Sequence, residues 1–559
     1  MKIVIVLFFI LTSCSLFAES PQFELSGISG KVQANVKKRL QELQQNKALH
    51  DTDAMELRHQ ILKAMQPYGY FHPEITLQTN NKKLNISIKK GPSLHLATVT
   101  AQLIGPGSNN PKLVALVNNI PLQSGHILSM RDYNKVKLNW LSTAENLGYL
   151  HASFKKAEIF IDEANNSADI SLIFDTGPLY YFGQVQFDPT YINPKLLHKF
   201  VPFHAGDPYS TKQILEFNNY LSNNGYFNSV LIKPLITDSQ EVPIHVQLQP
   251  VTKYSYTLGG GYGTDTGLRG RADLHVIPVN KSGHLFNASA QGSFTQNVLQ
   301  AQYLVPGFNP MVDQYTLTGN FSNLDYNSGY SNAILVSLAQ QHHQDWFQRN
   351  LSLNALYEGF TYNNQPNSYQ FLLYPKATFT LSQSQNKLFS PTGFTFNVNT
   401  LVASKLALSS IDMGQVSLDA KGAYMFDPLR LRLYGHLLQG LTITKDINKV
   451  PLSLALLLGG TENLKGYSYN SIGPGKVISY GGFELQKETK KNWYILGFFD
   501  AGFVDAPNIN KPHLDLGLGL MWVSPIGPIK IGVAQAINNQ FQRLNDTKPR
   551  LVISMGSDL

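Results

Sequence analysis

A tripeptide that recurs three times is the strongest constraint on how the first half of this chain can fold. The copies are GYF at 69–71, GYL at 148–150 and GYF at 225–227, spaced about 80 residues apart. Self-similarity at a fixed period is typical of repeated structural units. Each copy follows a segment of helical periodicity and precedes a segment of alternating apolar and polar residues, so each marks the same place in one unit.

The third copy shows the unit most clearly. Ser210 followed by Gln213 has the capping-box pattern of a helix start, and Gly225 is the residue type that ends a helix in the left-handed conformation. Between them, apolar residues at helical spacing predict one buried face: Ile214, Phe217 and Leu221. A strand and a short helix precede this helix and two strands follow it, which predicts the order strand, helix, helix, strand, strand.

Two Gly-Pro pairs divide the repeats. They lie at 91–92 and 177–178, and both residue types interrupt regular structure. We therefore predict three α+β modules (β-α-α-β-β) at residues 19–93, 94–178 and 179–251.

Residues 252–559 show no helical periodicity and read as one strand after another. In a representative segment, Leu351, Leu353 and Tyr357 alternate with Ser352 and Asn354. Segments of about 10 residues with one apolar and one polar face, separated by turn residues, are typical of a membrane barrel. At roughly 19 residues per strand with its connection, this part predicts an all-β, 16-stranded transmembrane β-barrel.

The composition agrees with a barrel in a membrane. Charged residues make up 15% of the chain, against about 25% in soluble domains, while 27 Tyr and 31 Phe supply apolar surface. Beyond the N-terminus the longest apolar run is LSLALLL at 452–458, far below the ~18 residues of a spanning helix. The net charge of +8 is dispersed, whereas nucleic-acid binding needs clustered basic residues, so we expect no nucleic-acid partner.

The first 18 residues predict export. Lys2 precedes an apolar stretch at 3–11, and Ala18 supplies a small residue at the cleavage position, which is the pattern of a secretory signal peptide at 1–18. A second processing pattern competes with it, because LTSC at 11–14 resembles a lipoprotein box in which Cys14 would be lipidated. Both processing sites remain open at this point.

Motifs of covalent chemistry are missing from the sequence. It contains no G-x-S-x-G nucleophile elbow and no paired Cys or His spacing of a zinc site. GPGK at 473–476 lacks the full spacing of a phosphate-binding loop. We therefore predict that the protein is not an enzyme and has no cofactor or metal.

The modules and barrel together resemble the TamA family within the outer-membrane protein insertase superfamily, which also contains BamA. The resemblance covers nearly the whole chain and is most specific in GGTENLKGYSYNSIGP at 459–474. It implies that the modules are POTRA domains in the periplasm and that the barrel lies in the cell outer membrane. It also implies that a long extracellular loop folds into the lumen, with a tip made of Leu464, Lys465, Gly466 and Tyr467.

The resemblance further implies acidic partners for this tip inside the lumen. They match Glu484 and Asp500, and the F-x-D-x-G pattern adds Phe498 and Gly502. The family has an arginine where this chain has Lys465. A guanidinium offers a rigid fork of donors whereas an ammonium is a point charge, so we expect a looser hold on the loop. A cation in a partly desolvated lumen still needs an acidic partner.

The function that the resemblance implies is the folding and insertion of substrate β-barrels, autotransporters in particular. The first and last strands would close the barrel at a weak seam, whose opening exposes backbone groups that pair with an incoming strand. We expect pairs such as Ser255 and Ser554, or their near neighbours, to lie within crosslinking reach there. The implied seam residues are Tyr254, Ser255, Tyr256, Gly259, Gly260, Gly261, Leu551, Val552, Ile553 and Ser554.

The implied partners are unfolded barrel and autotransporter substrates, outer-membrane lipid, and a TamB-like protein anchored in the inner membrane, reached through the first module. The main alternative is a two-partner-secretion pore that exports an unfolded protein through the lumen. Those pores usually carry two modules and an N-terminal plug helix, whereas this chain has three repeats and shows no plug-like helix before Phe23. A diffusion porin would lack repeated modules.

Overall fold

The computed structural model describes residues 23–46, 52–80, 83–237, 239–384, 386, 388–505, 512–525, 527–537, 548–557 and 559. The predicted signal peptide and Cys14 lie outside these ranges. Among the described residues, no helix combines the length and the apolar composition needed to cross a bilayer. The described residues form two compact units: one holds those up to Gln186 together with Phe203–Glu216 and Ile232–His245, and the other holds Phe187–Pro202, Phe217–Leu231 and those from Val246 onward.

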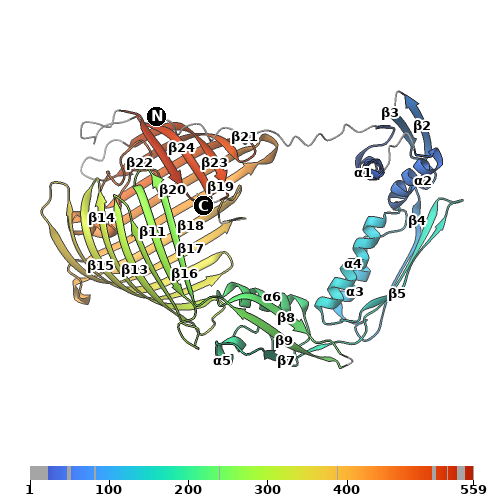
Figure 1. The fold of residues 1–559 in the computed structure, drawn as a ribbon, viewed down its shortest axis with the longest axis horizontal. Coiled ribbons are helices and arrows are strands. Elements are labelled where there is room, and N and C mark those ends of the chain that lie inside the picture. Colours follow the sequence, from blue (N-terminus) through green and yellow to red (C-terminus); the bar gives the residue numbers. More distant parts are fainter. Residues whose placement is uncertain are drawn as a thin grey trace, which may run out of the picture. The chain divides into compact units, whose positions relative to one another are not determined.

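The first module has the predicted element order (Figure 1). Its strands form a sheet in the order β1-β3-β2, with β1 parallel to β3. Apolar residues of both helices and of β3 form one core, including Val36, Leu40, Ile61, Met65 and Ile86. The elements are β1 (Phe23–Ser26), α1 (Gly30–Asn46), α2 (Ala54–Met65), the 3-10 turn η2 (Gln66–Tyr68), β2 (Glu74–Asn80) and β3 (Lys83–Lys89).

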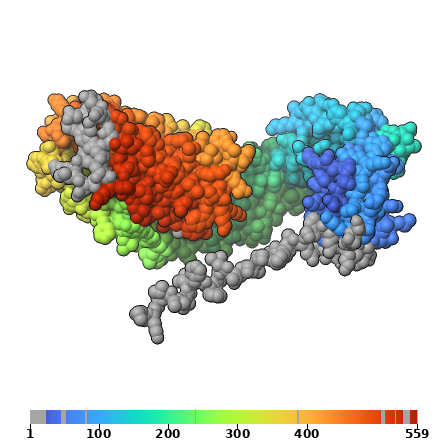
Figure 2. Space-filling model, turned by 90° about the horizontal axis from the view of Figure 1, so that it is seen from above, coloured from blue at the N-terminus to red at the C-terminus, as the bar shows by residue number. Residues whose placement is uncertain are grey.

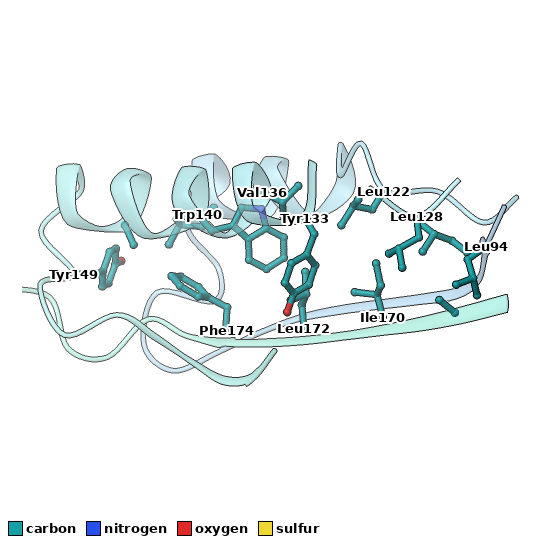
Figure 3. Packing of buried hydrophobic residues seen from close by; sticks show 14 residues of the cluster. Leu94, Leu122, Leu128, Tyr133, Val136, Trp140, Tyr149, Ile170, Leu172 and Phe174 are labelled. Atoms are coloured by element: carbon teal, nitrogen blue, oxygen red, sulfur yellow. The ribbon is translucent and has the colours of Figure 1, made fainter. Parts of the chain in front are cut away.

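The second module repeats this plan with a separate core. Its elements are β4 (His95–Ile104), α3 (Pro111–Asn118), α4 (Met130–Asn146), β5 (Ser153–Asp162) and β6 (Ser167–Asp175), with sheet order β4-β6-β5. Figure 3 shows side chains of α4 and β6 pointing toward one another, Trp140 and Tyr133 above Phe174 and Leu172. The Trp140 and Phe174 rings meet edge to face at 5.8 Å, a favoured aromatic geometry.

The third module also has the predicted order. Its elements are β7 (Tyr181–Phe187), α5 (Pro194–His198), α6 (Thr211–Asn223), β8 (Phe227–Pro234) and β9 (Glu241–Pro250), with sheet order β7-β9-β8. Asn193 caps α5 by accepting a hydrogen bond from the backbone of Lys195. α6 begins at Thr211, directly after Ser210.

In each module the repeated tripeptide lies between the end of the second helix and the last two strands. Its glycines all have positive φ, 82° at Gly69, 90° at Gly148 and 79° at Gly225, a conformation that only glycine adopts without strain. The carbonyls of Gly69 and Gly148 accept hydrogen bonds from Leu94 at 2.8 Å and Tyr180 at 2.9 Å. The motif therefore stops a helix and also ties it to the start of the next module.

The remaining strands form one 16-stranded sheet in consecutive order from β10 to β25, which confirms the predicted barrel. Each strand runs antiparallel to its neighbours in the chain. The strands are β10 (Tyr254–Gly263), β11 (Gly267–Val276), β12 (Leu285–Gly292), β13 (Gln296–Pro306), β14 (Asp313–Tyr326), β15 (Gly329–Gln344), β16 (Phe347–Tyr362), β17 (Ser368–Ser384), β18 (Gly393–Ala403), β19 (Met413–Phe426), β20 (Leu431–Thr444), β21 (Val477–Lys490), β22 (Trp493–Val504), β23 (His513–Ser524), β24 (Gly527–Ala536) and β25 (Arg550–Met555).

The alternation read from the sequence separates the two faces of the barrel wall. In β16, Leu353 and Tyr357 are half exposed, whereas the residues that directly follow them, Asn354 and Glu358, are buried. The same outward apolar pattern continues through the C-terminal strands, whose outer face is the red surface in Figure 2. Polar groups therefore face the lumen and apolar side chains face lipid.

Candidate functional site

A long loop between β20 and β21, residues 445–476 (the lumenal loop), is held at the inner wall of the barrel. Its first half contacts β16, because Glu358 Oε1 accepts a hydrogen bond from Ser453 N at 3.0 Å and Tyr362 donates to the carbonyl of Val450 at 2.8 Å. Leu452 is buried against Phe360 and Tyr362. The loop thus places its own backbone and apolar side chains inside the barrel.

The loop tip reaches β21 and β22. Lys465 is only 8% exposed, and its Nζ lies 3.0 Å from Asp500 Oδ2 and 3.4 Å from Glu484 Oε1. The ammonium also lies 4.8 Å from the ring centroid of Phe498, within the range of a cation–π contact. The structure therefore brings Lys465 together with both acidic residues that the family resemblance implied, Glu484 and Asp500.

The small residues of the two motifs make room for this contact. A side chain at Gly502 would place its Cβ 2.7 Å from Leu464, and one at Gly466 would place it 2.8 Å from Asp515. Leu464 and Tyr467 are themselves buried, at 0% and 3% exposure. Tyr467 also donates to the carbonyl of Leu514 at 3.3 Å. The tip is packed on both sides rather than loosely held.

Three lumenal residues of this site were not predicted from the sequence. Lys530 is a second cation for Glu484 at 2.8 Å, and Asp515 Oδ2 accepts the backbone N–H of Gly466 at 2.9 Å. Tyr480 donates to Asp500 Oδ1 at 2.8 Å. The sequence did contain a signal for two of them. Asp515 and Lys530 interrupt strands of alternating apolar and small residues, and a charged residue at such a position must face the lumen.

The seam, defined as the junction of β10 and β25, has little backbone pairing. β10 and β25 stand at opposite ends of the strand order, and no paired ladder joins them among the described residues. A backbone hydrogen bond across it runs from Thr264 N, just after β10, to Ile553 O at 3.2 Å. Thr264 Oγ1 accepts from Ile553 N at 2.8 Å, and Arg269 donates to the carbonyl of Met555 at 3.4 Å.

This register corrects the expected pairing of Ser255 with Ser554. Ile553 lies opposite Thr264, at the end of the first strand, so Ser554 is close to that end and Ser255 is near the other. β25 has only six residues against ten in β10, so the two strands overlap over a short length. Among the described residues, no strand pairing joins Leu551 or Val552 to β10. Within the described strands, the predicted seam residues of β10 therefore have no partner in the last strand: Tyr254, Tyr256 and Gly259–Gly261.

The lumen is also filled from the opposite end. The β17–β18 connection lies at the other barrel end from the lumenal loop, because successive connections of an antiparallel meander alternate. Arg432, fully buried in β20, donates to the carbonyls of Ser390 at 2.9 Å and Pro391 at 3.1 Å. It also lies 4.7 Å from the ring centroid of Phe389. A buried guanidinium therefore holds this turn inside the barrel.

The chemistry available at these sites is ion pairing and hydrogen bonding. Within the described ranges, no group of three or more His, Cys, Asp or Glu side chains is arranged to hold a metal ion. What the arrangement offers is a charged contact that holds a loop in the lumen and a seam with few hydrogen bonds.

Comparisons with known proteins agree with this architecture. Residues 279–558 match the Omp85 superfamily domain, residues 22–91 match POTRA domain 1 of TamA, and residues 180–250 match a surface antigen variable number repeat of the POTRA type. BamA from Haemophilus ducreyi lacking POTRA domains 1–3 shares the fold, with a TM-score of 0.68, 15% identity and coverage of 82% of this chain and 99% of that chain. CdiB from Acinetobacter baumannii aligns with a TM-score of 0.48, 12% identity and coverage of 94% and 98%. Because the superfamily match spans half of the sequence, this chain belongs to the Omp85 superfamily of outer-membrane β-barrel proteins, which assemble or transport proteins.

Proposed function

We propose that this protein folds and inserts substrate β-barrels, autotransporters among them, through the seam between β10 and β25. The observation that carries the proposal is that no paired ladder joins β10 and β25 among the described residues, where the backbone contact runs from Thr264, just after β10, to Ile553. A net intramolecular hydrogen bond contributes only about 0.5–1.5 kcal/mol, so backbone pairing adds little to the cost of separating the two strands, and side-chain contacts supply the rest.

The membrane supplies the driving force for this reaction. Backbone groups without partners in hydrocarbon cost several kcal/mol each, and most of β10 has no partner on its seam side among the described residues. An incoming substrate strand would satisfy these groups by strand addition. The energy then comes from burying the substrate in lipid, and no nucleotide is required.

The alternative, export of an unfolded chain through the lumen, is disfavoured by what fills the barrel. The lumenal loop is anchored at Glu358 in β16 and at Asp500 in β22, six strands apart in the sheet order. Arg432 holds the β17–β18 turn from the other end. A lumenal route would have to release both obstructions, with loss of buried charged contacts that cost several kcal/mol to break.

We also propose a TamB-like partner anchored in the inner membrane, bound by the first module in the periplasm. The match of residues 22–91 to a TamA-type POTRA domain supports this assignment. Separate buried cores in the first two modules support the division at 19–93 and 94–178 and, by the same repeat, a third module at 179–251 before the barrel at 252–559.

A reversible lock of the seam tests the function. Cysteines at Thr264 and Ile553, in a Cys14→Ser background, should form a disulfide under oxidation and abolish insertion of a substrate barrel into proteoliposomes, with recovery after reduction. The matched control is a cysteine pair at Leu518 and Val533, which already face each other in β23 and β24, and its oxidation should change nothing. If the locked seam inserts substrate at the parent rate, the seam mechanism is wrong.

A further inference from the structure

The first hairpin, the last strand and the lumenal loop meet at two charged side chains. Arg550, the first residue of β25, donates from Nη2 to Asp265 Oδ1 in the β10–β11 turn. Its Nη1 donates to the main-chain oxygen of Lys465 at 3.0 Å. Asp265 Oδ2 accepts from Thr461 in the loop, at 2.6 Å from the backbone N and 2.7 Å from Oγ1. Each of the two side chains therefore contacts two other elements.

The fit of this cluster is close. The side chains of Arg550 and Asp265 are 18% and 6% exposed, so their charges interact with limited screening by water. Gly460 has φ of 112°, and a Cβ there would lie 2.8 Å from Asp265 Oδ2, so the loop backbone is pressed against this carboxylate. A guanidinium can donate to two separate acceptors from one rigid, charged, planar group, which a lysine ammonium cannot.

We propose that Arg550 and Asp265 form a latch that couples the position of the loop tip to the opening of the seam. The inference rests on the proposed function, because it assigns regulation to the same seam. The seam cannot open at Thr264 while Arg550 keeps its ion pair with Asp265 and its hydrogen bond to the carbonyl of Lys465. By linkage, withdrawal of the tip must weaken the closed seam by as much as seam opening weakens the seated tip.

Hydrogen exchange on the full chain in lipid nanodiscs, without substrate, tests the coupling. The seam reporter is the amide of Ile553, which donates to Thr264, and the tip reporter is the amide of Gly466, which donates to Asp515. Asp265→Asn and Arg550→Lys should each speed exchange at both reporters by about tenfold or more, the size expected from losing a buried charge-assisted hydrogen bond. Lys465→Ala, which frees the tip, should speed exchange at Ile553 as well.

The matched control is Asp273→Asn on β11 of the same hairpin. Asp273 pairs with Arg271 at 2.8 Å and, among the described residues, makes no hydrogen bond or ion pair with the loop or β25, so its replacement should change neither reporter. Faster exchange at only one of the two reporters, or at neither, would overturn the latch.

An insertion assay keeps this inference separate from the proposed function. If both reporters respond together but substrate crosslinks to lumenal residues instead of β10, the latch stands and the seam function fails. If substrate crosslinks to β10 while the reporters move independently, the seam function stands and the latch fails.

Discussion

Lys465 Nζ lies 3.0 Å from Asp500 Oδ2, which places the one cation of the loop tip against a carboxylate that is completely buried in β22. A buried carboxylate is costly unless a cation and hydrogen bonds compensate it. Asp500 receives both, from Lys465 and from the hydroxyl of Tyr480 at 2.8 Å. The loop is therefore part of what stabilises the barrel wall, and the wall is what keeps the loop in the lumen.

Removing the tip cation should destabilise the barrel. Lys465→Ala leaves Asp500 without its cation, and breaking one side of a buried pair costs about 3 to 5 kcal/mol, less where lumenal water compensates. Lys465→Arg should keep the parent stability, because a guanidinium can reach both Asp500 and Glu484. Denaturant unfolding in lipid vesicles measures both effects.

A double-mutant cycle separates pairing from independent damage. Lys465→Ala combined with Asp500→Ala should lose less stability than the sum of the single changes, since both remove the same contact. Strictly additive losses would mean that the tip and Asp500 do not stabilise each other.

The glycines of the first strand should matter for motion and not for packing. A Cβ at Gly259 meets no atom within 4 Å, and one at Gly260 comes no closer than 3.8 Å to Arg269 O, so alanine fits at both. Replacing both with alanine should lower the backbone entropy of the unpaired strand and so stabilise β10 in its present conformation by about 1 to 2 kcal/mol. Substrate insertion should then slow about fivefold while the barrel still folds. Gly435→Ala in β20, also in open space, is the control that should insert normally; an unchanged rate for the β10 double variant would contradict this role.

Tyr226 should fasten the third module to the barrel. Its hydroxyl donates to the carbonyl of Gly283 at 2.5 Å, so Tyr226→Phe should lose about 1 kcal/mol at this joint and speed proteolysis or exchange around residues 279–284. Tyr149→Phe is the matched control, because Tyr149 holds the same place in the second repeat and packs in an apolar core. Equal effects of the two changes would show that the hydroxyl contact is not the cause.

The same contact predicts a pH dependence. Burial raises the pKa of Tyr226 to about 12, from an ordinary value of 10.0. The folded state therefore holds the phenolic proton more tightly, and this contribution to stability is complete below pH 10 and is lost as the pH rises toward 12. The stability difference between the parent and Tyr226→Phe, measured by exchange at 279–284, should shrink across that window and stay constant below it.

Deleting the first module should leave the barrel intact. Its core is separate from that of the second module, so removal of residues 23–91 should preserve a heat-modifiable barrel on gels. The same deletion should abolish copurification of the TamB-like partner from crosslinked envelopes. Retention of that partner would contradict its binding to the first module, and loss of the folded barrel would contradict independent folding of the modules.

Freeing the β17–β18 turn should open the lumen. Arg432→Gln removes the charged donors to Ser390 and Pro391, and a hydrogen bond to a charged group contributes about 1.5 to 3 kcal/mol, so the turn should leave its place and single-channel conductance in planar bilayers should rise. Arg271→Gln, at an exposed arginine of β11, should not change conductance. If the Arg432→Gln variant conducts more but inserts substrate at the parent rate, insertion depends on the seam and not on an open lumen.

Much of the architecture could be predicted from local patterns. The three repeats, the element order of each module and the 16 strands follow from periodicities of 3.6 and 2 residues and from the glycines that end helices. These features depend on neighbours a few residues apart, so one sequence is enough to read them. The tip and its partners Glu484 and Asp500 came instead from resemblance to a family.

The tertiary structure alone decided which distant groups meet. Asp265 and Arg550 are 285 residues apart, and nothing in the sequence near either one specifies the other. The seam register, with Thr264 and not Ser255 opposite the last strand, depends on how far 16 strands are staggered when the barrel closes. Stagger accumulates over every strand pair and turn, and a shift in register moves each side chain to a new partner, so this relationship exists only in the assembled barrel.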